Sequence, residues 1–232
     1  MGSTFTPKAS LSKKDMDDCS KDFISALHDS VLCQILSNLS TKEAGSTSIL
    51  ARRWRYLFAY VPDLDFDDSS SLDPTSFAKF VDRVLELGKD CVLNKFSLKS
   101  GKDIWGWGSK VSSWISKVLE RGVSDLDLHF SPEIYSPLPS KIFKSKSLVR
   151  LKIGPEGGPS RQLKKVCLPK LKTLHLDSFM FEEDAMGFPK LLSGCPVLEE
   201  LGLPNLRWGY WESCSVSSKT LKRLILCSFK LL

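Results

Sequence analysis

The chain has 232 residues, 42% of them hydrophobic, and a net charge of +6, so it can bury the core of one or two globular domains. No apolar run approaches the ~18–20 residues of a membrane span, and the polar N-terminus lacks the apolar segment of a secretory signal. The seven cysteines are scattered without a close pair, which disfavours a zinc site and indicates reduced thiols in a soluble intracellular protein, nuclear or cytoplasmic.

Residues 1–21 are polar and aperiodic, and we expect them to form a disordered tail. A helical module is predicted over residues 22–62. Its first helix is indicated by apolar residues at offsets 0, 1, 4, 5 and 8 from Val31 to Leu39, a spacing that places them on one side of a helix.

Two further short helices are predicted in this module. Ser40 and Glu43 have the spacing of a capping box, in which the serine hydroxyl accepts a backbone N–H and the glutamate reaches back. A second helix is therefore expected over residues 41–50, and an apolar stripe from Trp54 predicts a third that ends at Pro62. A module of ~40 residues is marginally stable alone, so part of its apolar surface should contact the rest of the chain or a partner.

Beyond Pro62 the pattern alternates between strands and helices. Residues 63–68 read DLDFDD, and this alternation predicts a short strand. Helices are predicted from an N-cap at residue 73 to a glycine at residue 88, and over the apolar stripe at residues 111–119. Between these helices, residues 93–98 take the spacing L-x-x-L-x-L.

The same spacing recurs five times later in the chain. Counted from Leu98, the last apolar positions of successive copies are separated by 30, 25, 23, 27 and 23 residues. Leucine-rich repeats have a period of ~20–29 residues with one strand each. We therefore predict an α/β fold, in which a small three-helix module precedes an irregular leucine-rich-repeat solenoid with a parallel sheet over residues 63–232. Because the chain stops just after a strand, leaving a sheet edge uncovered, we expect it to be C-terminally truncated.

Residues 24–68 resemble the F-box of plant F-box/leucine-rich-repeat proteins, including FBD-like members. Residues 188–203, FPKLLSGCPVLEELGL, are similar to a repeat of the same family. The F-box resemblance departs from the family pattern at His28 and Ser40, where the family has proline, and at Phe58, where it has tryptophan. The matching positions are Leu27, Val31, Leu32, Ile35, Leu36, Leu39, Thr41–Ala44, Thr47, Leu50, Arg53, Trp54, Arg55, Leu57, Val61 and Pro62.

The resemblance implies an adaptor role within a Skp–cullin–F-box ubiquitin ligase. The F-box would dock on a Skp-family adaptor and through it on a cullin, and the repeats would hold a protein substrate that the sequence does not identify. No catalytic residue, metal or cofactor is required of the chain. The residues expected to face the adaptor are Leu27, Val31, Leu32, Ile35, Leu36, Leu39, Leu50, Trp54 and Leu57.

The outward face of the repeat strands is the expected substrate surface. In each copy of the spacing, the residues before and between the last two apolar positions should point away from the core. They read acidic, basic, near-neutral, acidic and basic in chain order, which suits a protein partner with complementary charge. The candidate substrate-binding residues are Asp125, Asp127, Arg150, Lys152, Thr173, His175, Glu200 and Arg223.

Two alternatives remain open at this point. Residues 141–172 contain ten basic residues and one acid, and residues 52–55 read RRWR, so the chain could bind nucleic acid. A nucleic-acid groove should be uniformly basic, however, and the striped face disfavours it. The second alternative is a protein-interaction scaffold whose F-box no longer docks on an adaptor. Neither a membrane partner nor a bound metal is expected.

Overall fold

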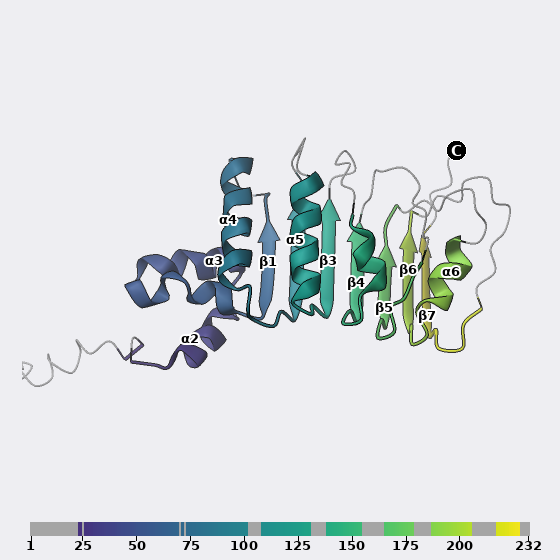
Figure 1. The fold of residues 1–232 in the computed structure, drawn as a ribbon, viewed down its shortest axis with the longest axis horizontal. Helices are drawn as coiled ribbons and strands as arrows, with labels where there is room; N and C mark the ends of the chain where they lie inside the picture. The colour runs from purple at the N-terminus through teal and green to yellow at the C-terminus, as the bar shows by residue number, and fades with distance from the viewer. Residues whose placement is uncertain are drawn as a thin grey trace, which may run out of the picture.

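Figure 1 shows a small helical module beside a row of parallel strands, with helices along one side of that row. The N-terminal tail predicted over residues 1–21 lies outside the described residues. The computed structural model describes residues 23–24, 26–69, 71, 73–101, 108–130, 138–154, 165–178, 187–205 and 217–227.

The N-terminal module consists of two short α-helices followed by three 3-10 turns. The predicted first helix and the capping box are confirmed: the Ser40 hydroxyl accepts the Glu43 N–H at 3.3 Å, and the Glu43 carboxylate accepts the Ser40 N–H at 3.0 Å. The elements are α2 (Asp29–Leu36), α3 (Thr41–Ser46), η1 (Thr47–Ile49), η2 (Arg52–Arg55) and η3 (Leu57–Tyr60).

The second and third helices of the module differ from the prediction. Helix α3 stops at Ser46 instead of reaching Leu50, because Ser46 Oγ and Thr47 Oγ1 donate to carbonyls three or four residues earlier and compete with the helical ladder. The predicted third α-helix is instead two 3-10 turns. The helix is interrupted at Tyr56, whose φ of −127° is not helical and separates the two turns.

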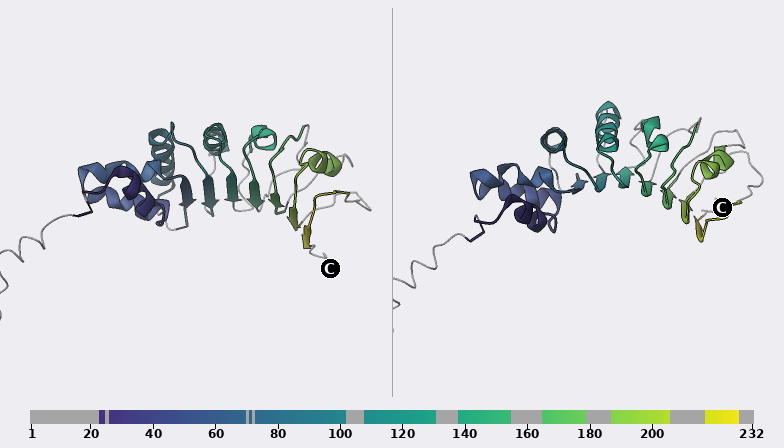
Figure 2. Two further views of the ribbon diagram at one scale, coloured as in Figure 1. Left: turned by 90° about the horizontal axis from the view of Figure 1, so that it is seen from below. Right: turned by 60° about the horizontal axis from the view of Figure 1, so that its bottom comes forward.

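The rest of the described chain builds a parallel sheet in which strand order follows chain order. The described helical elements between the strands lie on one side of the sheet (Figures 1 and 2); they are α4 (Pro74–Leu87), α5 (Gly108–Glu120), η4 (Ser140–Lys144) and α6 (Gly187–Ser193). The strands are β1 (Asp63–Asp67), β2 (Lys95–Ser100), β3 (Asp125–Phe130), β4 (Arg150–Gly154), β5 (Thr173–Leu176), β6 (Glu200–Pro204) and β7 (Arg223–Cys227).

The repeated leucine spacing sets the strand register, as predicted. Leu126 pairs with Leu151, and Leu151 with Leu174, so equivalent apolar positions stack from strand to strand towards the helices. The DLDFDD segment forms β1, whose Leu64 pairs with Phe96 of β2, and it is therefore the first strand of the same sheet. The predicted solenoid of one strand per repeat is confirmed.

The module covers the outer edge of β1. The Asp65 N–H donates to Thr41 Oγ1 of α3 at 2.7 Å, and Thr41 is buried. Phe58 of η3 stacks on Phe80 of α4 with ring centroids 6.0 Å apart. Buried apolar residues from both parts belong to one continuous core. An edge strand that is covered in this way cannot recruit another strand, so the module acts as a cap of the solenoid.

Helices α4 and α5 are connected through one carboxylate. Trp114 Nε1 donates to Asp82 Oδ1 at 2.6 Å, and Lys110 Nζ lies 3.1 Å from Asp82 Oδ2. Burial of Asp82 favours its neutral form, but the hydrogen bonds from Trp114 and Lys110 outweigh it and lower the pKa of this carboxyl. The ionised carboxylate therefore stabilises the packing of the first two helices of the solenoid.

Candidate functional site

The outer face of the N-terminal module is apolar. Val31, Ile35 and Leu39 are spaced by four residues along α2 and beyond it, and each is about 40% exposed. Ile49 and Leu50, where η1 ends, are 87% and 67% exposed. Residues four apart lie on the same side of a helix. We call these five residues the apolar face of the module, and exposed large apolar side chains in this number make it a candidate interaction surface.

The predicted adaptor-facing set is only partly on that face. Leu32 and Leu36 are fully buried, and Trp54 and Leu57 are nearly so, because α2 packs against η3 and turns these side chains into the core. In the free chain these four side chains contribute to the core, so their direct contact with an adaptor stays a prediction that their burial does not favour. Leu27 is partly buried against the same core. Of the predicted set, Val31, Ile35, Leu39 and Leu50 remain available.

The two positions that depart from the family's proline pattern keep the backbone that proline would impose. His28 has φ −66° and Ser40 has φ −61°, and proline fixes φ near −65°. Each is also the N-cap of the helix that follows, since His28 Nδ1 accepts the Ser30 N–H and Ser40 accepts the Glu43 N–H. Both helix starts are thus preserved by side-chain capping.

An ion pair ties the start of α2 to η2. Asp29 Oδ1 accepts from Arg53 Nε at 2.7 Å and lies 2.6 Å from Arg53 Nη2. Two guanidinium nitrogens that share one carboxylate oxygen restrict the relative orientation of the two elements. It therefore helps to present Val31 and Ile35 on a defined surface.

The predicted substrate-binding residues lie on the sheet face opposite the helices, in two rows. In each row, equivalent residues of neighbouring strands are paired across the sheet, and their side chains have the outward orientation expected from the sequence. The first row comprises Asp125, Arg150, Thr173, Glu200 and Arg223. The second comprises Asp127, Lys152, His175, Gly202 and Ile225.

Many of these charges pair with the neighbouring strand. Arg150 Nη1 lies 2.7 Å from Asp125 Oδ2, and Glu200 accepts from His175 Nε2 at 2.8 Å and from Arg223 Nη1 at 3.2 Å. The hydrogen bond with His175 is the main cause that lowers the pKa of Glu200. Several charges of the outward face are therefore paired with charges on the neighbouring strand, which leaves fewer unpaired charges for an external partner.

The basic stretch at residues 141–172 does not form one surface. Lys141 of η4 lies 3.3 Å from Glu120 on the helix side of the sheet, whereas Arg150 lies on the opposite face beside Asp125. Lys172 lies 3.3 Å from Glu199. The stretch is thus divided between two faces and partly paired with acids, so its described part lacks the continuous basic groove that nucleic acid requires.

Sequence reasoning missed Ile49 and the outward residues of β1 and β2. The sequence pattern places Ile49 near the end of a helix over residues 41–50, and the Ser-Thr-Ser run before it is the signal that the helix ends early. The outward residues Asp63, Asp65 and Asp67 of β1 were visible in the D-L-D-F-D alternation. The predicted substrate surface begins at Asp125 and therefore leaves out these residues and those of β2.

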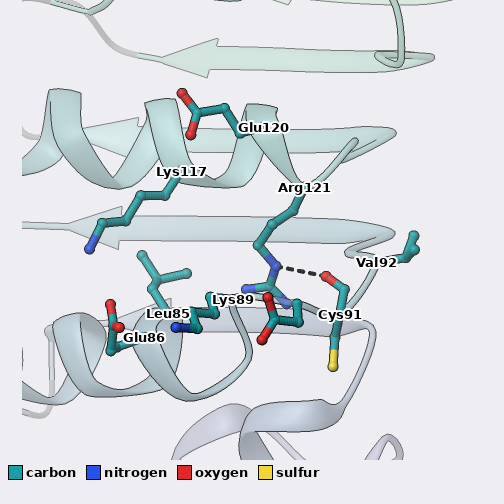
Figure 3. A pocket seen from close by; sticks show the side chains of 9 residues that line it. Leu85, Glu86, Lys89, Cys91, Val92, Lys117, Glu120 and Arg121 are labelled. Atoms are coloured by element: carbon teal, nitrogen blue, oxygen red, sulfur yellow. Dashed lines mark hydrogen bonds between the residues drawn. The ribbon is translucent and has the colours of Figure 1, made fainter.

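A cavity of about 380 Å³ lies between the ends of α4 and α5 (Figure 3). Arg121 extends into it from the end of α5, and its Nε donates to the Cys91 carbonyl at 2.9 Å. Its other two guanidinium nitrogens are buried without a hydrogen-bond partner among the described residues, and burial lowers the pKa of Arg121. The lining carries three acidic and three basic residues, so it favours neither an anionic nor a cationic ligand. Arg121 thus holds the loop after α4 against α5.

Two negative findings concern the described part of the chain. It contains no group of three or more side chains able to hold a metal ion. It also contains no helix with the length and apolar character needed to cross a bilayer.

Comparison with known proteins supports the two-part division. The F-box domain family matches residues 24–65, and the family described as FBD-associated F-box protein At5g56370, LRR repeats, matches residues 111–232. The Arabidopsis thaliana F-box/LRR-repeat protein At3g59210 is 63% identical over 221 residues, which cover 91% of this chain and 45% of that protein.

Other relatives agree, although they are longer. The F-box/LRR-repeat protein At4g14096 of Arabidopsis thaliana is 50% identical over 217 residues, covering 90% of this chain and 45% of that protein. The chain spans about half the length of the curated relatives it matches, and no solved structure matches it. The matched families and these relatives, together with the helical module and the parallel repeat sheet, show that the chain belongs to the F-box/leucine-rich-repeat proteins of plants.

Proposed function

We propose that the chain is a substrate-recognition subunit of a Skp–cullin–F-box ubiquitin ligase. The observation that carries the proposal is the apolar face of the module, since Val31, Ile35 and Leu39 stay exposed although the module already packs against the solenoid. Burying such side chains on a partner contributes roughly 25 cal/mol per Å² of apolar area. A Skp-family adaptor is the partner that an F-box in this family implies.

In this proposal the chain itself performs no bond-making step. The module, over about residues 22–62, binds the adaptor and through it the cullin, and the repeats from residue 63 onward hold a protein substrate. Holding both on one rigid body converts a chance encounter with the ubiquitin-conjugating enzyme into an intramolecular one at high effective concentration. The continuous core between module and repeats supports this rigidity. We place this activity inside the cell, in the nucleus or the cytoplasm.

The substrate is proposed to bind the sheet face that carries Arg150, Lys152 and Glu200. The outward orientation of these residues supports the proposal, and so does the position of β4 and β6 in the sheet, away from β1, which the module covers. The divided basic stretch gives no comparable support to nucleic-acid binding.

The test is co-purification with a plant Skp-family adaptor. Wild type should form a stable complex, and both Ile35→Asp and Leu50→Asp should weaken it by about tenfold or more, because each places a charge in an apolar interface. Val92→Asp is the matched control, since Val92 is an exposed apolar residue outside the module. Circular dichroism should show that all three variants are folded. Absence of a wild-type complex at micromolar concentration would reduce the chain to an interaction scaffold.

A further inference from the structure

A second cavity, of about 580 Å³, lies where the module meets the solenoid. It is bounded by α3, β1 and the start of α4. Cavities of ~300–1,000 Å³ accommodate ligands or large side chains. The cavity lies outside the apolar face of the module and outside the substrate-binding rows from β3 to β7.

The cavity has an aromatic floor. Phe66 of β1 meets Phe77 and Phe80 of α4 edge to face, with ring centroids 6.5 and 5.9 Å apart. Phe80 is partly exposed and stacks in turn on Phe58 of the module. A Cβ on Gly45 of α3 would lie 3.2 Å from the Phe80 ring, so the wall fits closely at that point. The floor is therefore apolar and held from two sides.

The rim of the cavity is acidic. Asp65 and Asp67 of β1 and Asp73 before α4 line it, against one lysine, Lys42. Hydrogen bonds from Ser69 lower the pKa of Asp67, and those from Ser76 and Thr75 lower the pKa of Asp73. Asp73 already caps α4, so its charge partly serves the helix. Asp65 is exposed and makes no ion pair among the described residues, so its carboxylate can meet an incoming cation.

The acidic character continues over the outward face of the first three strands. This face carries five aspartates against two lysines: Asp63, Asp65, Asp67, Asp125 and Asp127 against Lys95 and Lys99. Of the five, Asp125 is neutralised by Arg150 of the next strand. A partner that leaves the cavity along this face therefore meets mostly negative charge.

We propose that this junction cavity binds a basic segment of a protein partner, which inserts one large apolar side chain over the phenylalanines and places lysine or arginine residues against the rim. Apolar burial supplies most of the affinity, and the rim selects for positive charge next to the anchor. The inference concerns the chain alone and does not require the adaptor, so loss of adaptor binding and loss of this site are separate results.

The experiment measures binding of the labelled peptide Gly-Lys-Arg-Phe-Arg-Lys-Gly to the full chain by fluorescence anisotropy. Replacing the peptide phenylalanine by alanine should weaken binding by about tenfold, the equivalent of losing one buried aromatic side chain. Replacing its four basic residues by glutamate should abolish binding. In the chain, Ser46→Trp, which fills the cavity from an exposed position on α3, should also abolish it.

The matched pair Asp65→Asn and Asp63→Asn separates the cavity from general electrostatics. Both residues are exposed on the same face of β1, but only Asp65 lines the cavity. Asp65→Asn should weaken peptide binding about threefold more than Asp63→Asn. Equal effects of the two, or equal binding of the alanine peptide, would overturn the proposal. Binding of phenethylammonium as tight as the peptide would assign the cavity to small cations and overturn it as well.

Discussion

The N-terminal module and the repeat sheet share one core, but the module exposes apolar side chains and the outward sheet face exposes charged ones. The module ends in short 3-10 turns and leaves Val31, Ile35 and Ile49 exposed, whereas the outward sheet face carries charged side chains, several of them paired between strands. Apolar surface provides affinity with little selectivity, and charge provides selectivity with little affinity. The difference suits a module that binds one constant partner and a sheet that discriminates among variable ones.

The largest expected effect is a difference in stability between two substitutions in α2, one at the buried Leu32 and one at the partly exposed Ile35. Leu32→Asp should destabilise the chain by more than about 3 kcal/mol, because it buries an unpaired charge in the core. Ile35→Asp should change stability by less than about 1.5 kcal/mol, because its side chain is partly exposed and the new carboxylate can reach water. Urea unfolding of both variants checks this contrast. Equal destabilisation would mean that the apolar face is part of the core.

Within the solenoid, Asp82→Ala should cost about 1–2 kcal/mol, because it removes the hydrogen bonds from Trp114 and Lys110. The lowered pKa of Asp82 adds a pH dependence: its stabilisation is present above the pKa of an unfolded aspartate and is lost as pH falls through the lower folded value. Wild type should therefore lose more stability between neutral pH and about pH 3 than the variant. Parallel pH profiles would contradict this assignment.

Capping in the module should have a smaller effect. Ser40→Ala should cost about 1 kcal/mol, since it removes the hydroxyl that accepts the Glu43 N–H and donates to the Glu43 carboxylate, while the backbone N–H of this position is kept. His28→Pro should be tolerated within about 0.5 kcal/mol, because His28 already has the φ of proline and its N–H precedes the helix. Thermal unfolding of the two variants compares them, and strong destabilisation by proline would show that the His28 cap is essential.

The smallest effect is expected on the outward sheet face. Arg150→Ala removes an exposed pair with Asp125 and should cost less than about 1 kcal/mol, even less at high salt. Chemical denaturation at low and high salt measures it. A larger, salt-independent loss would show that these pairs hold the strands together, which would leave the face less suited to a partner.

The repeat sheet could be predicted from the sequence because each strand repeats one apolar template and each repeat contacts its neighbours. Pairs such as Leu126 with Leu151 follow directly from that spacing. The ion pair between Asp125 and Arg150 could not be predicted, since it depends on side-chain conformations in two strands that are 25 residues apart.

The buried and exposed sides of α2 could not be told apart in the same way. The helix is apolar on both sides, so offsets alone do not show that Leu32 and Leu36 turn inward while Val31 and Ile35 turn outward. Packing against η3 decides the matter, and η3 itself was predicted as part of an α-helix. The junction cavity was hidden for a related reason, because it needs the relative positions of α3, β1 and α4.

The most direct test of the proposed division of labour is hydrogen exchange of the backbone amides with and without a Skp-family adaptor. The account predicts that added protection is confined to α2 and residues 47–50, while amides of β3 to β7 exchange at unchanged rates. Protection of the sheet strands with none in α2 would contradict it, because the adaptor would then occupy the face assigned to the substrate.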